Sequence, residues 1–176
     1  ITAEHEYSSQ STDHVLGLSM DEYKTMLFTL FTDGTSRLYH AKTGDQITAP
    51  QIDFEGKEIR TIAHTINREH WAFAFADGTV RLGKAHFVTE IITPKDLPQN
   101  LTKLDERDST DGTYIYSQVP GNQFRKIFFE FELGEPLEVT ENQKAIIAMD
   151  YRVSGEAERQ LKAFAVVDSE GEVTLN

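Results

Sequence analysis

The chain has 176 residues and a mass of 20.0 kDa, a size typical of one domain or of a piece of a larger one. Its net charge of −12 argues against a surface for nucleic acids or anionic membranes, and no apolar run approaches the roughly 18 residues of a membrane span. The absence of cysteine excludes disulfides, thiolate nucleophiles and cysteine-based zinc sites. Eleven Phe and six Tyr are too many for a disordered tail.

Short apolar runs separated by turn signals begin near residue 15. Val15–Leu18 predicts a first strand, and the nearly continuous apolar run Thr25–Phe31 predicts a strand that is covered on both faces. The pair Asp33-Gly34 then supplies the positive φ that a tight turn needs. A weak strand at 44–47 ends this first unit.

A second unit resembles the first and follows it at an offset of 44 residues, which is the distance from Asp33 to Asp77. The segment 31–38 (FTDGTSRL) returns as 75–82 (FADGTVRL). Within 71–76, three aromatic rings alternate with three alanines, so we expect rings on one face of that strand and methyl groups on the other. A further weak strand is expected at His86–Ile91.

Two more units are expected at similar spacing. The turn Pro120-Gly121-Asn122 falls between strand-like runs, of which Ile127–Phe129 predicts a buried strand. The segment 163–168 (AFAVVD), followed by Gly171, resembles 72–77 (AFAFAD). One period therefore consists of a four-stranded antiparallel meander of about 44 residues, the length of a propeller blade.

The sequence thus predicts an all-β fold, with antiparallel four-stranded meanders arranged as the blades of a partial or fragmentary β-propeller. We expect one domain over residues 1–176, with approximate blades at 12–48, 57–92, 100–139 and 144–176. Helix is scarce: 156–163 has helical composition and 94–104 has room for one turn, but neither sustains a helical apolar stripe.

The last unit lacks its outermost strand, and an open strand edge is a liability that proteins usually cover. Three interpretations stay open: residues 1–8 supply the strand, the parent ring is larger, or two chains pair edge to edge. Truncation of a larger ring is preferred.

Residues 59–84 (IRTIAHTINREHWAFAFADGTVRLGK) resemble a WD40-type blade. They depart from that family because Gly83-Lys84 stands where a Trp-Asp pair closes the third strand, and because no Gly-His pair opens the repeat. The runs 75–84 (FADGTVRLGK) and 131–137 (FELGEPL) also resemble the large soluble insertion of some bacterial phosphate-type ABC transporter permeases. That resemblance implies a periplasmic accessory domain. It transfers no functional residue, since the transport residues of that family lie in its membrane helices.

No motif predicts a catalytic, cofactor-binding or metal site. The histidines do not have the spacing of a metal-binding helix: they are His5, His14, His40, His64, His70 and His86. His64 and His70 could face each other across a hairpin, but a polar turn with one hydrogen-bonded histidine is preferred. The densest acidic cluster lacks the spacing of a Ca²⁺ loop, so a solvated loop is preferred. That cluster consists of Asp105, Glu106, Asp108 and Asp111, with Gly112.

Two further groups of residues each allow a functional and a structural interpretation. Arg37 and Arg81 occupy equivalent positions of two units, where they either line one rim or, as we prefer, form exposed strand ends. Trp71, Phe73 and Phe75 could form a ligand platform, but packing between sheets is preferred. The motifs of serine hydrolases and of phosphate-binding loops are absent, and spacing cannot select a glycosidase carboxylate pair.

We therefore expect a non-catalytic accessory or interaction domain of a bacterial ABC-type, phosphate-like transport permease, on the periplasmic side of the plasma membrane. No cofactor, metal or catalytic residue is expected. The expected partners are proteins or the remaining blades of the parent chain, with no nucleic acid, with membrane contact only through the parent's transmembrane segments, and with an edge-to-edge homodimer left open. The alternatives are a fragment of a propeller enzyme, such as a glycosidase or lactonase, and a cytoplasmic WD40-like protein-interaction scaffold.

Overall fold

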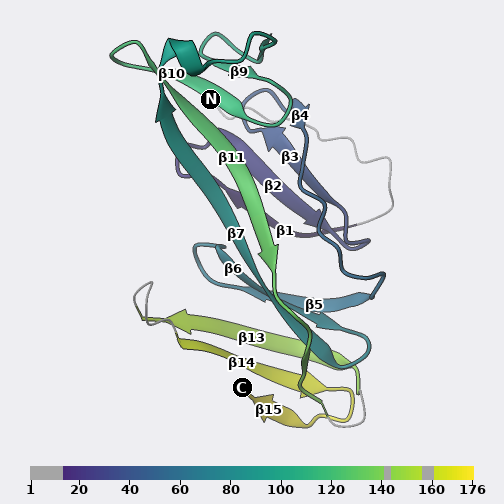
Figure 1. Cartoon of the computed structure of the whole chain (residues 1–176). Coiled ribbons are helices and arrows are strands. Elements are labelled where there is room, and N and C mark those ends of the chain that lie inside the picture. Colours follow the sequence, from purple (N-terminus) through teal and green to yellow (C-terminus); the bar gives the residue numbers. More distant parts are fainter. Residues whose placement is uncertain (1–13, 141–143, 156–160) are drawn as a thin grey trace. The chain divides into compact units, whose positions relative to one another are not determined.

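The computed structural model describes residues 14–140, 144–155 and 161–176 (Figure 1). These residues form fifteen β-strands and one 3₁₀ helix, η1 (Pro94–Asp96), and every strand pair whose register is described is antiparallel. The predicted all-β antiparallel class is therefore confirmed. Residues 161–163, the end of the segment with helical composition, lie in a strand, and 156–160 lie outside the described residues. No helix in the described part of the chain is long and apolar enough to cross a membrane.

The strands form three sheets. The first has the order β1 (Val15–Met20), β2 (Met26–Phe31), β3 (Ser36–His40) and β4 (Gln46–Ile47). The second has the order β5 (Ile59–His64), β6 (His70–Phe75), β7 (Thr79–Ile92), β11 (Gln123–Leu133), β10 (Ile115–Val119), β9 (Asp108–Thr110) and β8 (Thr102–Lys103), with β12 (Leu137–Glu138) also paired with β7. The third contains β13 (Ile146–Ser154), β14 (Leu161–Asp168) and β15 (Val173–Leu175).

Among the described strands, only those of the first sheet form a separate four-stranded meander. The expected second and third units share one eight-stranded sheet, because β11 lies beside β7, and the last sheet has three described strands. The expected weak strand at His86–Ile91 is also not separate, since β7 continues without a break from Thr79 to Ile92. Gly83, the fifth residue of β7, has no positive φ and does not interrupt the strand.

The chain divides into two compact units, which are described one at a time. Of the described residues, the first unit contains 14–31, 35–51 and 86–130, and the second contains 32–34, 52–85, 131–140, 144–155 and 161–176. In the first unit, β2 is buried along almost its whole length, as its apolar run predicts. The Phe28 ring stacks on Phe129 at 4.3 Å, and Phe129 also meets Phe87 at 4.9 Å between ring centroids.

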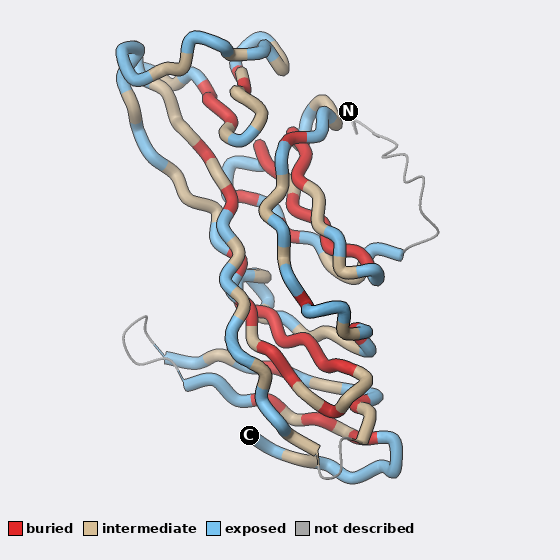
Figure 2. The backbone as a smooth tube through the Cα atoms, turned by 45° about the vertical axis from the view of Figure 1, so that its right-hand side comes forward, coloured by how far each residue is buried: buried red, intermediate tan, exposed pale blue. Residues whose placement is uncertain are grey.

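In the second unit, all six residues of β6 are buried (Figure 2). On one face, the Phe73 ring lies 5.1 Å from the Phe54 ring and 6.0 Å from the Phe131 ring. On the other face, Ala72 and Ala74 belong to a core cluster with apolar side chains of β13 and β14, which are Ile146, Tyr151, Phe164 and Val166. The alternation of rings and methyl groups is confirmed, and it serves packing because small methyls let a neighbouring sheet approach closely.

Gly83 lies directly under the aromatic face of β6. A Cβ atom at this position would lie 2.8 Å from Phe131 Cζ and 3.0 Å from Phe73 Cε2. We expect Gly83→Ala to lower the free energy of unfolding by about 1–3 kcal/mol, the usual cost of overpacking a core. Urea denaturation measures this cost. The loss of unfolding free energy should be smaller when Phe131 is also replaced by leucine. An unchanged stability of Gly83→Ala would contradict this packing.

Candidate functional site

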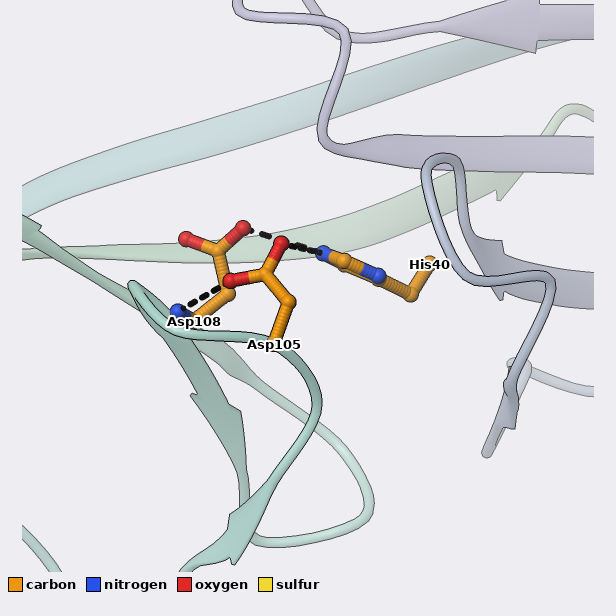
Figure 3. A group of neighbouring side chains, drawn as sticks. All are labelled: His40, Asp105 and Asp108. Atoms are coloured by element: carbon orange, nitrogen blue, oxygen red, sulfur yellow. Dashed lines mark hydrogen bonds and ion pairs between the residues drawn. The ribbon is translucent and has the colours of Figure 1, made fainter. Parts of the chain in front are cut away.

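A buried polar cluster lies in the first unit, between the end of β3 and the start of β9 (Figure 3). His40, the last residue of β3, is fully buried. Its Nε2 atom lies 3.0 Å from Asp108 Oδ2, and its Nδ1 atom lies 2.9 Å from Thr43 Oγ1. Asp108, the first residue of β9, is also buried. Two polar groups 68 residues apart thus satisfy each other inside the protein.

Two further charges surround this pair. Lys42 Nζ donates to Asp108 Oδ2 at 3.2 Å and lies 3.6 Å from Asp105 Oδ2. The other oxygen of Asp105 accepts hydrogen bonds from the backbone N–H groups of Arg107 and Asp108, so this carboxylate also shapes the loop. Burial by itself raises the pKa of Asp108, but hydrogen bonds from His40 and Lys42 more than offset burial and hold the pKa well below its usual range.

The cluster has the donor set of a metal site. One ligand atom each from His40, Asp105 and Asp108 lie within 4.8 Å of one another, and imidazole with carboxylates suits a divalent cation. The Lys42 ammonium already contacts both carboxylates, however, and supplies the positive charge that a metal would bring. The arrangement is therefore a salt-bridge network that ties β3 to β9.

The acidic residues of the predicted cluster have different surroundings and partners in the structure. The expectation of a solvated loop is wrong for Asp108, because His40 and Lys42 hold its carboxylate in the interior. Asp111 instead caps its own turn: its Oδ1 accepts from the N–H of Thr113 and Tyr114, and its Oδ2 accepts from the Tyr116 hydroxyl. Glu106 is exposed, and Gly112 is half-buried.

His64 and His70 do not face each other. In the β5–β6 pair, His64 lies opposite Trp71, and its Nδ1 is hydrogen-bonded to the Thr65 carbonyl at 3.1 Å. His70 is buried, and this burial lowers its pKa. The preferred interpretation, a polar turn with one hydrogen-bonded histidine, agrees with this geometry. His14 and His86 are exposed, and His5 lies outside the described residues.

The two arginines at equivalent sequence positions have different roles. The expectation of an exposed strand end is wrong for Arg81, which is buried in the second unit. Its Nε donates to the Gly134 carbonyl at 2.8 Å, and one terminal nitrogen donates to the Asp53 carbonyl and the Glu55 carboxylate. Arg37 is half-buried, with its guanidinium carbon 4.6 Å from the centre of the Phe31 ring.

The outer edge of β15, in the second unit, offers unpaired backbone. β15 pairs with β14, and no strand of the described ranges pairs with its other edge. Phe164 and Asn176 exchange both backbone hydrogen bonds, at 2.8 and 2.9 Å, and Asp168 N–H donates to the Glu172 carbonyl. Because such pairs alternate along an antiparallel ladder, the backbone groups of Val173 and Leu175 point away from β14.

The side chains on this edge are apolar and exposed. Val173 is 65% exposed and Leu175 is 78% exposed, and both lie on one face of the sheet because they are two residues apart. The edge therefore offers main-chain hydrogen bonds together with apolar contact area. The amino-acid sequence predicts that the last unit lacks a strand, but it does not show which backbone groups face outward, since that depends on the register with β14.

No family model matches the chain, and no curated protein matches it. Among solved structures, the chain is similar to the Cps50 (Swd1) β-propeller domain of Myceliophteria thermophila, with a TM-score of 0.37, 16% identity, and coverage of 93% of this chain and 50% of that one. It is also similar to the WD40 domain of SCAP from fission yeast, with a TM-score of 0.28, 11% identity, and coverage of 93% and 39%. The chain thus spans half or less of these structures. At these identities and TM-scores neither similarity indicates a function, and none of these comparisons supports the expected relation to a permease.

Proposed function

We propose that this protein is a non-catalytic interaction module that takes up an extended segment of a partner protein at the open edge of β15. The observation that carries the proposal is the outward backbone of Val173 and Leu175 beside their exposed side chains. An added strand satisfies unpaired backbone groups and gains affinity from main-chain hydrogen bonds, while side-chain contacts give specificity. Blades of a partial propeller are the architecture that we propose for the sheets.

Two proline variants test strand addition at this edge. Leu175→Pro removes an N–H that faces away from β14, whereas Thr174→Pro removes one that faces β14. We expect Leu175→Pro to keep the fold and to weaken partner binding about fivefold, since one lost main-chain hydrogen bond is worth about 1 kcal/mol. Thr174→Pro should instead detach β15 and lower stability. Val173→Lys is a second edge variant that leaves the backbone groups in place.

The partner is captured by a photo-crosslinking amino acid placed at position 173 in the cells that make the protein. Position 66 is the matched control, because Ile66 is fully exposed on the β5–β6 turn. We expect one discrete adduct from position 173, none from position 66, and loss of the adduct in Leu175→Pro. The same adducts from both positions, or an adduct with the mass of two copies of this chain, would overturn the proposal of a partner strand.

The finer expectations of the sequence remain proposals. An extracytoplasmic location within a transport permease rests only on the resemblance of 75–84 and 131–137. The absence of enzyme activity is proposed because the buried His40 and Asp108 pair with each other and with Lys42, which leaves neither group free to act as an acid or a base. Of the functions weighed, a protein-interaction scaffold is the one that the open edge of β15 favours.

A further inference from the structure

A small pocket with a basic lining lies beside the buried polar cluster of the first unit. Its volume is about 260 Å³. Three cations line it from three different loops or strands: Lys42 after β3, Arg107 before β9, and Arg125 on β11. A pocket with three cations is unexpected in a chain of net charge −12, where acidic side chains outnumber basic ones by 29 to 17.

Arg125 is held in a fixed position at this pocket. Its guanidinium carbon lies 3.5 Å from the centre of the Tyr23 ring, which is a cation–π contact. Its Nε atom is buried and has no hydrogen-bond partner within the described ranges. A buried N–H without an acceptor is costly, and Nε of Arg125 is the unsatisfied donor among the cations that line this pocket.

The negative groups around the pocket are already engaged. Asp108 lines it, but its carboxylate is held by His40 and Lys42. The Asp105 carboxylate lies 3.6 Å from the Lys42 ammonium. The Glu22 carboxylate accepts a hydrogen bond from the Tyr23 hydroxyl, and this bond raises the Tyr23 pKa. The residues that line the pocket carry a net charge of +2, from three cations and Asp108, while Asp105 and Glu22 lie outside this lining.

We propose that this pocket binds an oxyanion group, a carboxylate or a phosphate, with Arg125 and Arg107 as its main ligands. A guanidinium offers parallel N–H donors that match two oxygens of such a group, and charge-assisted hydrogen bonds of this kind are the strong ones. Thr25, Ser117 and Gln118 add polar side chains to the lining. The site lies in the first unit and β15 in the second, so this inference stands apart from the proposed function.

Calorimetric titration of the full chain tests the site with two probes, inorganic phosphate and succinate, at low ionic strength. We expect saturable 1:1 binding of at least one probe, an affinity that falls as NaCl is added, and a loss of roughly tenfold or more in Arg125→Gln, since a charge-assisted bond is worth about 1.5–3 kcal/mol. Saturation by phosphate alone identifies a phosphate site, and saturation by succinate alone identifies a carboxylate site. The matched control is Arg152→Gln, which makes the same charge change at an arginine 81% exposed and outside the pocket.

Arg107→Gln keeps the test decisive if Arg125→Gln does not fold, because the Arg107 side chain is exposed. It should weaken binding in the same direction without changing the melting temperature of the free protein. An absence of saturable heat with both probes, or equal affinities in the wild type, the two pocket variants and Arg152→Gln, would overturn the proposal.

Discussion

Replacement of Phe73 by alanine is expected to lower the free energy of unfolding by about 3–5 kcal/mol, the usual cost of deleting a large buried ring. Phe73 is fully buried, and its ring meets those of Phe54, Trp71 and Phe131. The loss is large because these neighbours come from separate segments of the second unit and cannot all move into the cavity. Urea denaturation, followed by the fluorescence of Trp71, measures the loss, since this is the single tryptophan of the chain.

The matched control for Phe73→Ala is Ile66→Ala. Ile66 is fully exposed, so removing its side chain should change stability by less than about 0.5 kcal/mol. If Phe73→Ala unfolds at the same urea concentration as the wild type, the packing described for β6 is wrong. If both variants are destabilised equally, the effect does not report burial.

Replacement of Asp108 by alanine is expected to cost about 2–3 kcal/mol. Removing one partner of a fully buried ion pair costs about 3–5 kcal/mol. The cost is lower here because Lys42, whose side chain is 53% exposed, can regain water, while the fully buried His40 cannot. Asp108→Asn keeps the size of the side chain and removes the charge, so it separates the electrostatic part of the loss from the packing part.

The lowered pKa of Asp108 also predicts that the stability of the protein depends on pH. The pKa of Asp108 is lower in the folded protein than its usual value, so the stabilisation by its charge is fully present above the unfolded pKa of about 3.9 and is lost progressively as pH falls below that value toward the folded pKa. The stability difference between the wild type and Asp108→Asn should therefore shrink as pH drops below about 4. Glu106→Gln, at an exposed neighbouring position, is the control. A difference that stays constant down to pH 2 would show that the Asp108 charge does not stabilise the fold.

Local chemistry made much of the fold predictable. The turns at Gly34 and Gly78 follow from Asp-Gly pairs, and both glycines have positive φ, 82° and 79°. The alternation of rings and alanines in 71–76 likewise predicted a strand with two different buried faces. These features depend on neighbours within a few residues, because side-chain direction in a strand repeats every two positions.

The candidate sites could be predicted much less well. Nothing in the neighbourhood of His40 or Asp108 indicates that they meet, since their contact spans 68 residues. Arg37 and Arg81 occupy equivalent positions in two repeats, yet only Arg81 is buried, because Gly134, Asp53 and Glu55 surround it in its own unit. Lys42, Arg107 and Arg125 likewise gather at one pocket only through strand pairing.

The amino-acid sequence alone determined the β-class, the tight turns and the two-faced strands of this protein, because backbone φ preferences and side-chain alternation act over short distances. Only the tertiary structure decided which charges are buried together, which cations share a pocket and which backbone groups β15 leaves open. These depend on the register and order of strands that are far apart in the chain, and a shift of one residue would turn each side chain to the opposite face.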